Sequence, residues 1–351
     1  RIVILMVLLK SMESFTIYRR YQMPQPKAQI EIPTKSYVVR YPSAVDAAIQ
    51  QQNVFWAAEK MGVEADEQDF RTKLTEGENH AVLSLQAILT QYEIMIGGVE
   101  MWGGKIAKMF PRLEIQRMCA TFAYAELASH APFYKVGNQV LNRDTDEFYE
   151  SCQEIPELAN HLDFVESKAK SKNPLEVTAA LCFLEGVVLF SAFAFFKSFN
   201  SNGFNLIPHF VAGIDASAKD ENFHSMASAW LYSTCKMERE ALGLDTHYDG
   251  LIKDLAYETY NHECAIIDHI YSVKPETVRT MDKEDLKQFI RDRTDLVCSY
   301  LGHPPIFNQP KGVVSEWFYK NLSSFKYSDF FAATQVQYTK NYNKNSLGFG
   351  V

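Results

Sequence analysis

The chain has 351 residues, of which 47% are hydrophobic and 13% aromatic, and its formal net charge is −8. This composition excludes global disorder, because a chain of this length and apolar content can bury a large core. The negative charge, with no Lys/Arg-rich stripe, argues against a nucleic-acid-binding protein. Six scattered cysteines without a CxxC pair favour reduced thiols in a cytoplasmic protein over a disulfide framework or a zinc site.

The chain divides into an arm, a helical domain and a tail. Residues 1–42 contain the β-favouring stretches AQIEIP and SYVVRYP, interrupted by prolines, and predict an extended arm. Residues 43–324 carry a helical hydrophobic period and predict an all-α bundle. Residues 325–351 lose this period but keep aromatic side chains, so we expect a partner-docking tail with a flexible tip.

The helical period is interrupted at polar or glycine-rich stretches, the clearest of which are Gly103-Gly104, SKNP, FNSNG and HPPI. Between these breaks, the predicted helices cover residues 43–62, 66–75, 77–103, 111–141, 145–152, 156–169, 175–201, 204–240, 246–272 and 283–302.

Two apolar segments raise the question of a membrane. Residues 1–10 have the length of a signal-peptide core, but no small-residue cleavage site follows, and Met12 is a plausible alternative start. Residues 177–196 are long enough to span a membrane. Glu185 in the middle of this segment would cost about 2–3 kcal/mol in a bilayer. We therefore predict a buried helix in which Glu185 has a partner, and no membrane association.

An acid, an imidazole and a phenol recur at four-residue spacing in the stretch AELASHAPFY. Glu126, His130 and Tyr134 would share one face of an α-helix. A second stretch, KDENFHSMASAWLY, places Glu221 and His224 on one helix face as well. Both patterns are typical of helices that bind a metal in a bundle core.

Two further carboxylates, Glu93 and Glu185, lie in apolar helical stretches. Four long helices would then each offer an inward carboxylate, and two of them also a histidine, which is the donor set of ferritin-like di-iron and dimanganese proteins. Four carboxylates neutralise two divalent cations, and imidazole suits iron or manganese. Without the cations, the carboxylates should repel one another and take up protons. The sequence therefore predicts a dinuclear metal site in a ferritin-like bundle.

Other acids and histidines are alternatives to this set. Glu100 lies seven residues after Glu93 on the same face and could replace it. Glu258 and His262 are also four residues apart, but their helix has the pattern of a solvated or half-buried polar face. The remaining histidines lack a partner at ligand spacing and are expected on the surface or in loops: His80, His161, His209, His247 and His303.

The order of these motifs resembles the small, radical-generating subunit of class I ribonucleotide reductase, over nearly the whole chain after residue 40. The stretch FW at 55–56 stands where that family keeps a tryptophan ahead of the first ligand helix. FAYAELASHAPFY, LEGVVLFSAF and KDENFH resemble the family's three later ligand helices. HPPIFN and SDFFAATQVQY resemble its late turn and its tyrosine-bearing tail.

The resemblance implies a pair of iron ions, or manganese, or a mixed manganese–iron pair, with one or more carboxylates bridging the two ions. In this reading the first ion is held by Glu93, Glu126 and His130, and the second by Glu185, Glu221 and His224.

The resemblance also implies a route for a radical. Tyr134 would store the radical formed when the reduced metals activate O₂. Trp56 and Asp220 would belong to the internal radical path. Tyr338, or alternatively Tyr342, would continue this path toward a large subunit that binds the tail.

One feature departs from the family's pattern. The family spaces its first pair as Glu-x-x-His, whereas three residues separate Glu126 from His130. A π-bulge can absorb one extra residue. Pro132 also removes a backbone donor and crowds residue 128. We therefore predict a break in regular i→i−4 hydrogen bonding within residues 122–136.

The sequence thus predicts the small subunit of ribonucleoside-diphosphate reductase, acting as a homodimer with a separate large subunit in the reduction of ribonucleotides to deoxyribonucleotides. No phosphate-binding glycine loop is present, so substrate chemistry is expected in the partner. Two alternatives remain: another dimetal oxidase on the same scaffold, or a non-catalytic helical protein that stores metal or binds partners. The aromatic tail favours the first reading, because the alternatives need no such extension.

Overall fold

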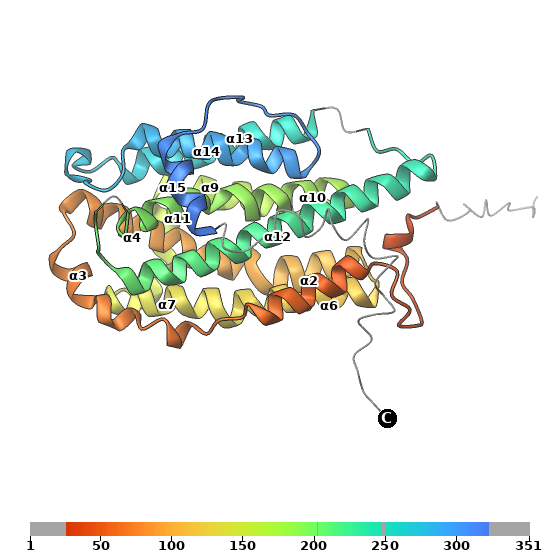
Figure 1. Cartoon of the computed structure of the whole chain (residues 1–351), viewed down its shortest axis with the longest axis horizontal. Helices are drawn as coiled ribbons and strands as arrows, with labels where there is room; N and C mark the ends of the chain where they lie inside the picture. The colour runs from red at the N-terminus through yellow and green to blue at the C-terminus, as the bar shows by residue number, and fades with distance from the viewer. Residues whose placement is uncertain (1–25, 202, 248–249, 323–351) are drawn as a thin grey trace, which may run out of the picture.

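A computed structural model describes most of the chain (Figure 1), in three stretches: residues 26–201, 203–247 and 250–322. Every regular element in these stretches is helical, which confirms the all-α prediction. The predicted tail at 325–351, with Tyr338 and Tyr342, lies outside the described residues, as do the first 25 residues of the predicted arm.

The elements comprise α-helices, short 3₁₀ segments (η1, η2, η3, η6 and η8) and three π-helical segments (η4, η5 and η7). In chain order they are η1 Gln29–Glu31, α2 Pro42–Asn53, η2 Ala58–Lys60, η3 Val63–Asp66, α3 Glu67–Thr72, α4 Glu76–Tyr92, η4 Glu93–Ile106, α5 Ala107–Met109, α6 Leu113–Ala125, η5 Glu126–His130, α7 Ala131–Val140, α8 Asp146–Glu150, η6 Ser151–Glu154, α9 Pro156–Ala169, α10 Pro174–Phe183, η7 Leu184–Val188, α11 Phe190–Ser198, α12 Pro208–Ala241, α13 Leu251–Ile270, η8 Pro275–Thr277, α14 Lys283–Tyr300 and α15 Val313–Leu322.

The long helix α12 runs through the middle of the bundle and contacts α10, η7 and α11 in succession (Figure 1). On one side of the bundle, α6 packs against both α2 and η4. On the other side, α13 and α14 pack together and cover η7. This arrangement brings η4, η5, η7 and α12 to a common interior.

Local capping explains where two of the ligand-bearing helical runs begin. At the start of α4, Thr75 Oγ1 accepts from the backbone of Glu78, while Glu78 Oε2 accepts from the backbone of Thr75. This reciprocal pair is a capping box. At the start of α10, the Asn173 side chain accepts from the backbone of Leu175, and Pro174 occupies the first helical position. These signals mark where the two helices begin.

The helix predicted at 43–62 ends earlier, at Asn53. Val54, Phe55 and Trp56 follow in sequence, and β-branched and aromatic side chains lose rotamer freedom in a helix. Trp56 gains a tertiary contact instead, because its indole Nε1 donates to Asp220 Oδ2 at 2.9 Å. The chain therefore leaves the helix after Asn53, and Trp56 makes this long-range hydrogen bond instead.

The break predicted at Gly103-Gly104 is also wrong. The backbone stays helical through both glycines as part of η4 and continues to Ile106. Trp102, the residue before them, is fully buried and hydrogen-bonds Glu185 across the bundle. Tertiary packing therefore overrides the weak helix propensity of glycine here.

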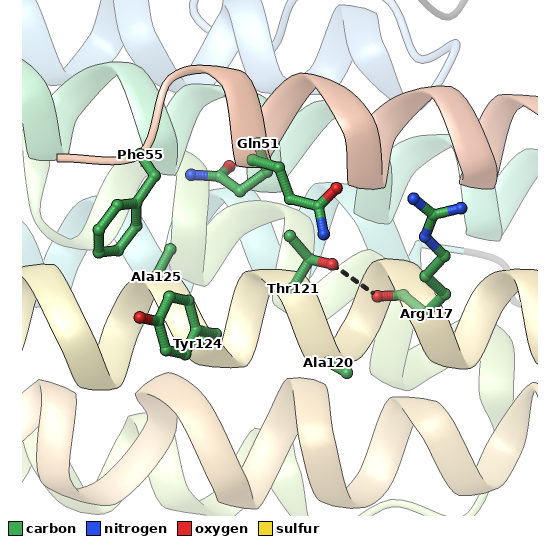
Figure 2. Close-up of a pocket in the computed structure, with 8 residues that line it drawn as sticks. Gln51, Phe55, Arg117, Ala120, Thr121, Tyr124 and Ala125 are labelled. Atoms are coloured by element: carbon green, nitrogen blue, oxygen red, sulfur yellow. Dashed lines mark hydrogen bonds between the residues drawn. The ribbon is translucent and has the colours of Figure 1, made fainter. Parts of the chain in front are cut away.

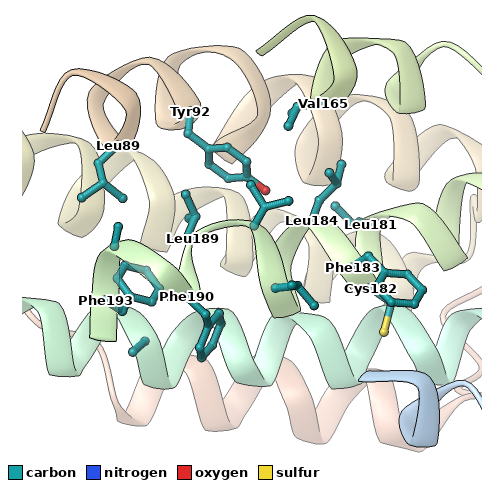
Figure 3. Close-up of a cluster of buried hydrophobic side chains, with 14 of the residues drawn as sticks. Leu89, Tyr92, Val165, Leu181, Cys182, Phe183, Leu184, Leu189, Phe190 and Phe193 are labelled. Atoms are coloured by element: carbon teal, nitrogen blue, oxygen red, sulfur yellow. The ribbon is translucent and has the colours of Figure 1, made fainter. Parts of the chain in front are cut away.

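The apolar segment from α10 to α11 forms the core of the bundle. The stretch Pro174–Ser198 is long enough to cross a membrane, and its most apolar 18-residue window has a mean hydropathy of 2.2, but that window is entirely buried inside the protein. Figure 3 shows Leu189 and Phe193 of this segment beside Leu89 and Tyr92 of α4. Burying each such large apolar side chain contributes about 1.5–3 kcal/mol. The prediction of a buried core helix is confirmed.

The described part of the arm packs against the end of α12. Ile30 is buried, and its backbone amide donates to Glu238 Oε2 at 2.7 Å. Arg239 makes a two-pronged pair with Glu31, at 2.8 and 2.9 Å. The segment forms a 3₁₀ turn, Gln29–Glu31, rather than the β-type conformation that its composition favours.

Candidate metal centre

All six side chains predicted as metal ligands lie in the bundle interior, and none is more than 3% exposed. The bundle brings them together from four segments: η4 supplies Glu93, η5 supplies Glu126 and His130, η7 supplies Glu185, and α12 supplies Glu221 and His224.

The ligand atoms form two overlapping groups. Within each group, the atoms lie within 4.8 Å of one another. One group contains Glu93 and His130, the other contains Glu185 and His224, and Glu126 and Glu221 belong to both. The geometry therefore suits two adjacent ions with two shared carboxylates.

Both imidazoles present Nδ1 to the shared carboxylates. His130 Nδ1 lies 2.6 Å from Glu126 Oε2 and 3.0 Å from Glu221 Oε1. His224 Nδ1 lies 2.8 Å from Glu126 Oε1 and 3.7 Å from Glu221 Oε2. The two histidines thus face the same pair of acids from opposite groups.

The outer nitrogen of each imidazole is held by a hydrogen-bonding partner. His130 Nε2 lies 3.2 Å from Asp220 Oδ2, which also accepts from Trp56 Nε1. His224 Nε2 lies 3.2 Å from Gln51 Oε1, and Gln51 Nε2 donates to Asp220 Oδ1 at 3.0 Å. Such partners fix the orientation of ligand histidines. Asp220 and Trp56 join the site as the sequence suggested, whereas Gln51 was not foreseen.

Several buried polar atoms of the centre lie close to one another but make no hydrogen bond of regular geometry. They are both carboxylate oxygens of Glu93 and of Glu126, one oxygen of Glu221, and Nδ1 of both histidines. Buried polar groups nearly always find partners, and unpaired buried charges are costly. Carboxylate oxygen and imidazole nitrogen are donors that iron and manganese accept. The residues present therefore fit a dinuclear metal centre.

The protonation of the metal-free centre follows from burial and crowding. Burial and the charge of Glu126 raise the pKa of Glu93, and burial and the charge of Glu221 raise the pKa of Glu185. Burial alone would raise the pKa of Glu221, but its interactions with Glu185 and both imidazoles lower it. Burial opposes protonation of His224, yet the Glu126 carboxylate raises its pKa to about 9. The raised pKa values of Glu93 and Glu185 agree with the expected proton uptake, whereas the nearby imidazoles lower the pKa values of Glu126 and Glu221 against it.

Trp102 is a second contributor that sequence analysis missed. Its indole Nε1 donates to Glu185 Oε1 at 2.8 Å, and its ring packs edge-on against Phe122. The bond fixes one oxygen of Glu185 and leaves the other free to face the centre. A tryptophan next to a glycine pair carries no periodic signal, so only the fold places it here.

Tyr134 lies in the interior beside the centre. The residue is fully buried, and its hydroxyl makes no hydrogen bond. Burial and the charge of Glu93 raise the pKa of the phenol well above its ordinary value. The ring of Phe133 lies 5.3 Å from that of Tyr134 and stacks on Phe210. These apolar surroundings keep water from the phenol.

The predicted break in regular bonding near Pro132 is confirmed. Residues Glu126–His130 form the π-helical segment η5, and α7 begins immediately after it at Ala131. Pro132 then falls in the first turn of α7, where its missing N–H is tolerated. The wider turn keeps Glu126 and His130 on one face despite the extra residue between them.

The alternative ligands are not part of the centre. Glu100 is exposed, whereas Glu93 is buried. Glu258 is also exposed and forms an ion pair with Lys168. One of the histidine predictions is wrong, because His161 is fully buried. Its place on the inner face of α9 could have been read from the apolar residues one turn away.

A surface pocket of about 460 Å³ lies between α2 and α6 and is lined in part by the buried Gln51 (Figure 2). Phe55 and Tyr124 stack at one end of it, with ring centroids 5.2 Å apart, and both are exposed. Ile49 and Leu127 are also exposed nearby on α2 and η5. These side chains form an outward apolar face, which we call the α2–α6 face.

Comparisons with known proteins agree on one family. The sequence profile of the family "Ribonucleotide reductase, small chain" matches residues 34–313. The beta subunit of ribonucleoside-diphosphate reductase from Treponema pallidum is 24% identical over 361 residues, covering 94% of this chain and 97% of that protein.

Solved structures share the fold. The dimanganese(II)-NrdF structure from Streptococcus sanguinis matches with a TM-score of 0.67 at 18% identity, covering 83% of this chain and 99% of that one. The Rnr4 homodimer from Saccharomyces cerevisiae matches with a TM-score of 0.66 at 16% identity, covering 89% of this chain and 92% of that one.

Proposed function

Because this chain belongs to the ribonucleotide reductase small chain family, we propose that its buried centre oxidises Tyr134 to a stable radical that serves a large catalytic subunit. The chain is the small subunit of a ribonucleoside-diphosphate reductase, an oxidoreductase that supplies deoxyribonucleotides. The observation that carries the proposal is the pair of ligand groups that share Glu126 and Glu221 beside a buried phenol.

Two bound iron or manganese ions would supply the oxidising equivalents by reacting with O₂. The four carboxylates neutralise the charge of the ions, and the two Nδ1 atoms complete the donor set. Tyr134 gives up one electron and its phenolic proton. The apolar neighbours of the phenol then protect the radical from water and reductants.

The hydrogen-bonded chain from His130 through Asp220 to Trp56 supports a radical path toward the surface. Trp56 is only half-buried, so this chain connects the interior with the outside. We propose that Tyr338 or Tyr342 in the tail continues the path and that the tail docks on the large subunit. This part rests on the sequence, since both tyrosines lie outside the described residues.

We further propose that the metals are iron, manganese or a mixed pair, since the donor set suits either element. The name of the Streptococcus sanguinis relative specifies two manganese ions, which keeps manganese among the candidates. All six cysteines are free thiols, in keeping with a reducing cytoplasm.

We propose that a second copy of the chain covers the α2–α6 face. Phe55 and Tyr124 stack on each other while 39% and 56% exposed, Leu127 is 50% exposed, and exposed apolar side chains of this kind mark an interaction surface. The yeast relative is named as a homodimer. Sedimentation of a Phe55→Asp/Tyr124→Asp variant tests this, and an unchanged dimer would contradict it.

The proposed radical is tested by spectroscopy. Metal-free protein is loaded with ferrous iron under anaerobic conditions and then exposed to air. We expect a tyrosyl electron paramagnetic resonance signal that disappears in Tyr134→Phe, while iron binding is unchanged. Tyr92→Phe is the matched control, because Tyr92 is another fully buried tyrosine next to Glu93. Metal uptake without any radical would favour an oxidase or a storage protein instead.

A further inference from the structure

Arg293 on α14 is a buried cation without an acidic partner. The residue is 0% exposed, and no carboxylate among the described residues lies within ion-pair distance of it. The terminal nitrogens Nη1 and Nη2 also make no hydrogen bond. Burying a charge in this way is expensive. Its contacts therefore need an explanation other than charge pairing.

Two contacts of Arg293 fall on the segment that carries Glu185, and the side chains of Tyr300 and Tyr319 also lie close to the guanidinium. Its Nε donates to the carbonyl oxygen of Gly186 at 2.5 Å. Its guanidinium carbon lies 3.7 Å from the ring centroid of Phe190. Gly186 directly follows Glu185 within the π-helical turn η7, and Phe190 begins α11. One side chain thus contacts the middle of the turn and the start of the helix that follows it.

The packing at Gly186 leaves the turn little freedom to shift. A Cβ atom at this position would lie 2.4 Å from Ser225 Oγ and 2.6 Å from Val297 Cγ2. Ser225 directly follows the ligand His224 on α12, and Val297 lies one turn after Arg293 on α14. The glycine therefore lets α12 and α14 approach η7 closely from two sides.

A π-helical turn departs from the regular i→i−4 pattern, so its carbonyls are open to side-chain donors. We infer that Arg293 is a positioning residue for the metal centre: by donating to Gly186 and stacking on Phe190, it fixes η7 in the π conformation that aims Glu185 at Glu221. The inference rests on the proposed dinuclear site. It assigns a function to a residue outside the ligand set.

Manganese(II) binding to the full chain tests this role without requiring turnover. Titration calorimetry and electron paramagnetic resonance are compared for the wild type, Arg293→Met and Arg291→Met. Arg291 is the matched control, because it lies on the same helix but contacts Tyr260 instead of η7. Thermal unfolding monitors the fold of each variant.

We expect the wild type to bind two ions with an exchange-coupled spectrum. In Arg293→Met, the second ion should bind about 10–100-fold more weakly, as for other residues that orient ligands, and an uncoupled manganese signal should appear. Arg291→Met should match the wild type. A merely structural role would lower the unfolding temperature without separating the affinities of the two ions.

Two results would overturn the inference. One is an Arg293→Met protein that binds both ions with wild-type affinity and coupling. If that variant does not fold, Arg293→Lys decides, since lysine keeps the charge but lacks the planar group that both stacks and donates. If Arg293→Lys binds the second ion as tightly as the wild type does, the guanidinium is not needed and the inference is refuted. A wild-type protein that binds fewer than two ions would instead refute the proposed site itself.

Discussion

The ligands come from two kinds of backbone. Helix α12 is regular for 34 residues and presents Glu221 and His224 at i, i+3 spacing. The other three segments are π-helical where they meet the centre: Glu93 is the first residue of η4, Glu126 the first of η5, and Glu185 the second of η7. The centre is therefore built from one regular α-helix and three π-helical segments.

The two kinds of backbone determine the orientation of a ligand side chain in different ways. On α12, the sequence spacing alone puts Glu221 and His224 on one face, and the regular backbone needs no outside support. On the π-helical segments, the orientation of the carboxylate depends on contacts with other helices, such as the hydrogen bond from Trp102 to Glu185. π-turns are rare in proteins as a whole, and those that do occur are often found at functional sites. Substitutions on α12 and on the π-helical segments should therefore affect ion binding and stability in different ways.

The largest effect is expected from the shared carboxylates. Glu221→Ala on α12 and Glu126→Ala on η5 each remove a carboxylate that belongs to both ligand groups. Both should reduce manganese binding from two ions to fewer than one and abolish the radical. Glu240→Ala, at an exposed site near the end of α12, is the control and should bind normally. Retention of two tightly bound ions in either variant would show that the carboxylate is not shared.

The next effect concerns the extra residue in η5. Deleting Ala128 would place Glu126 and His130 at the spacing that Glu221 and His224 have on α12. We expect the π-turn to revert to α-helix, with two ions still bound but with altered spectra, because Glu126 shifts relative to Tyr134. Deleting Ala120 from the regular part of α6 is the control, and it should prevent folding. If the two deletions behave alike, η5 is not the place where an extra residue is absorbed.

Close packing gives the third prediction. Gly186→Ala on η7 would push a methyl group into Ser225 and Val297. We expect a loss of about 1–3 kcal/mol in the free energy of unfolding, as for other overpacked cores, together with weaker binding of the second ion. Gly203→Ala has no atom within 4 Å of the new Cβ and serves as an uncrowded control, although its backbone φ of +91° adds strain of its own. Denaturant unfolding measures both variants, and an unaffected Gly186→Ala would mean that α12 and α14 can move apart.

Trp102→Phe should have a smaller effect. It removes the indole hydrogen bond to Glu185 but keeps most of the ring. Loss of a hydrogen bond to a charged group costs about 1.5–3 kcal/mol, or roughly 10–100-fold in affinity for the ion that Glu185 binds. The first ion, on the Glu93 side, should be unaffected. If calorimetry shows that both ions bind equally more weakly, Trp102 does not act specifically on the ion at Glu185.

The last effect involves no substitution and varies gradually with pH. In the metal-free protein, the pKa values of Glu93, Glu185 and His130 are raised, and that of His224 is about 9. Ions bind only the deprotonated ligands, so binding must release protons and strengthen as pH rises. Each released proton changes the affinity by about tenfold per pH unit between pH 6 and 8. Calorimetry in buffers of different ionisation enthalpy counts the protons, and pH-independent binding would be inconsistent with the proton-loaded site.

The sequence predicted the parts of the site that repeat with helical period. Acid–histidine spacing identified Glu126, His130, Glu221 and His224, and an acid within an apolar helix identified Glu185. The spacing anomaly and Pro132 predicted η5. Nothing comparable marks η4 or η7, whose π-turns depend on contacts with other helices.

The partners of the ligands were harder to predict for the same reason. Gln51 and Trp102 have no spacing relation to an acid or a histidine in the chain, and each reaches the centre only across the bundle. The end of α2 at Asn53 was missed because the hydrogen bond of Trp56 to Asp220, a contact far away in sequence, determines it. His161 was misplaced because its burial depends on the packing of α9 rather than on a ligand pattern.

The central claim is that six side chains from one regular helix and three π-helical segments bind two cations. Crystals soaked in manganese(II) and measured at the manganese absorption edge test it most directly. We predict two anomalous peaks about 3.5–4 Å apart, both between Glu126 and Glu221, with Glu93 and His130 at one peak and Glu185 and His224 at the other. A single peak, or peaks away from these side chains, would contradict the account.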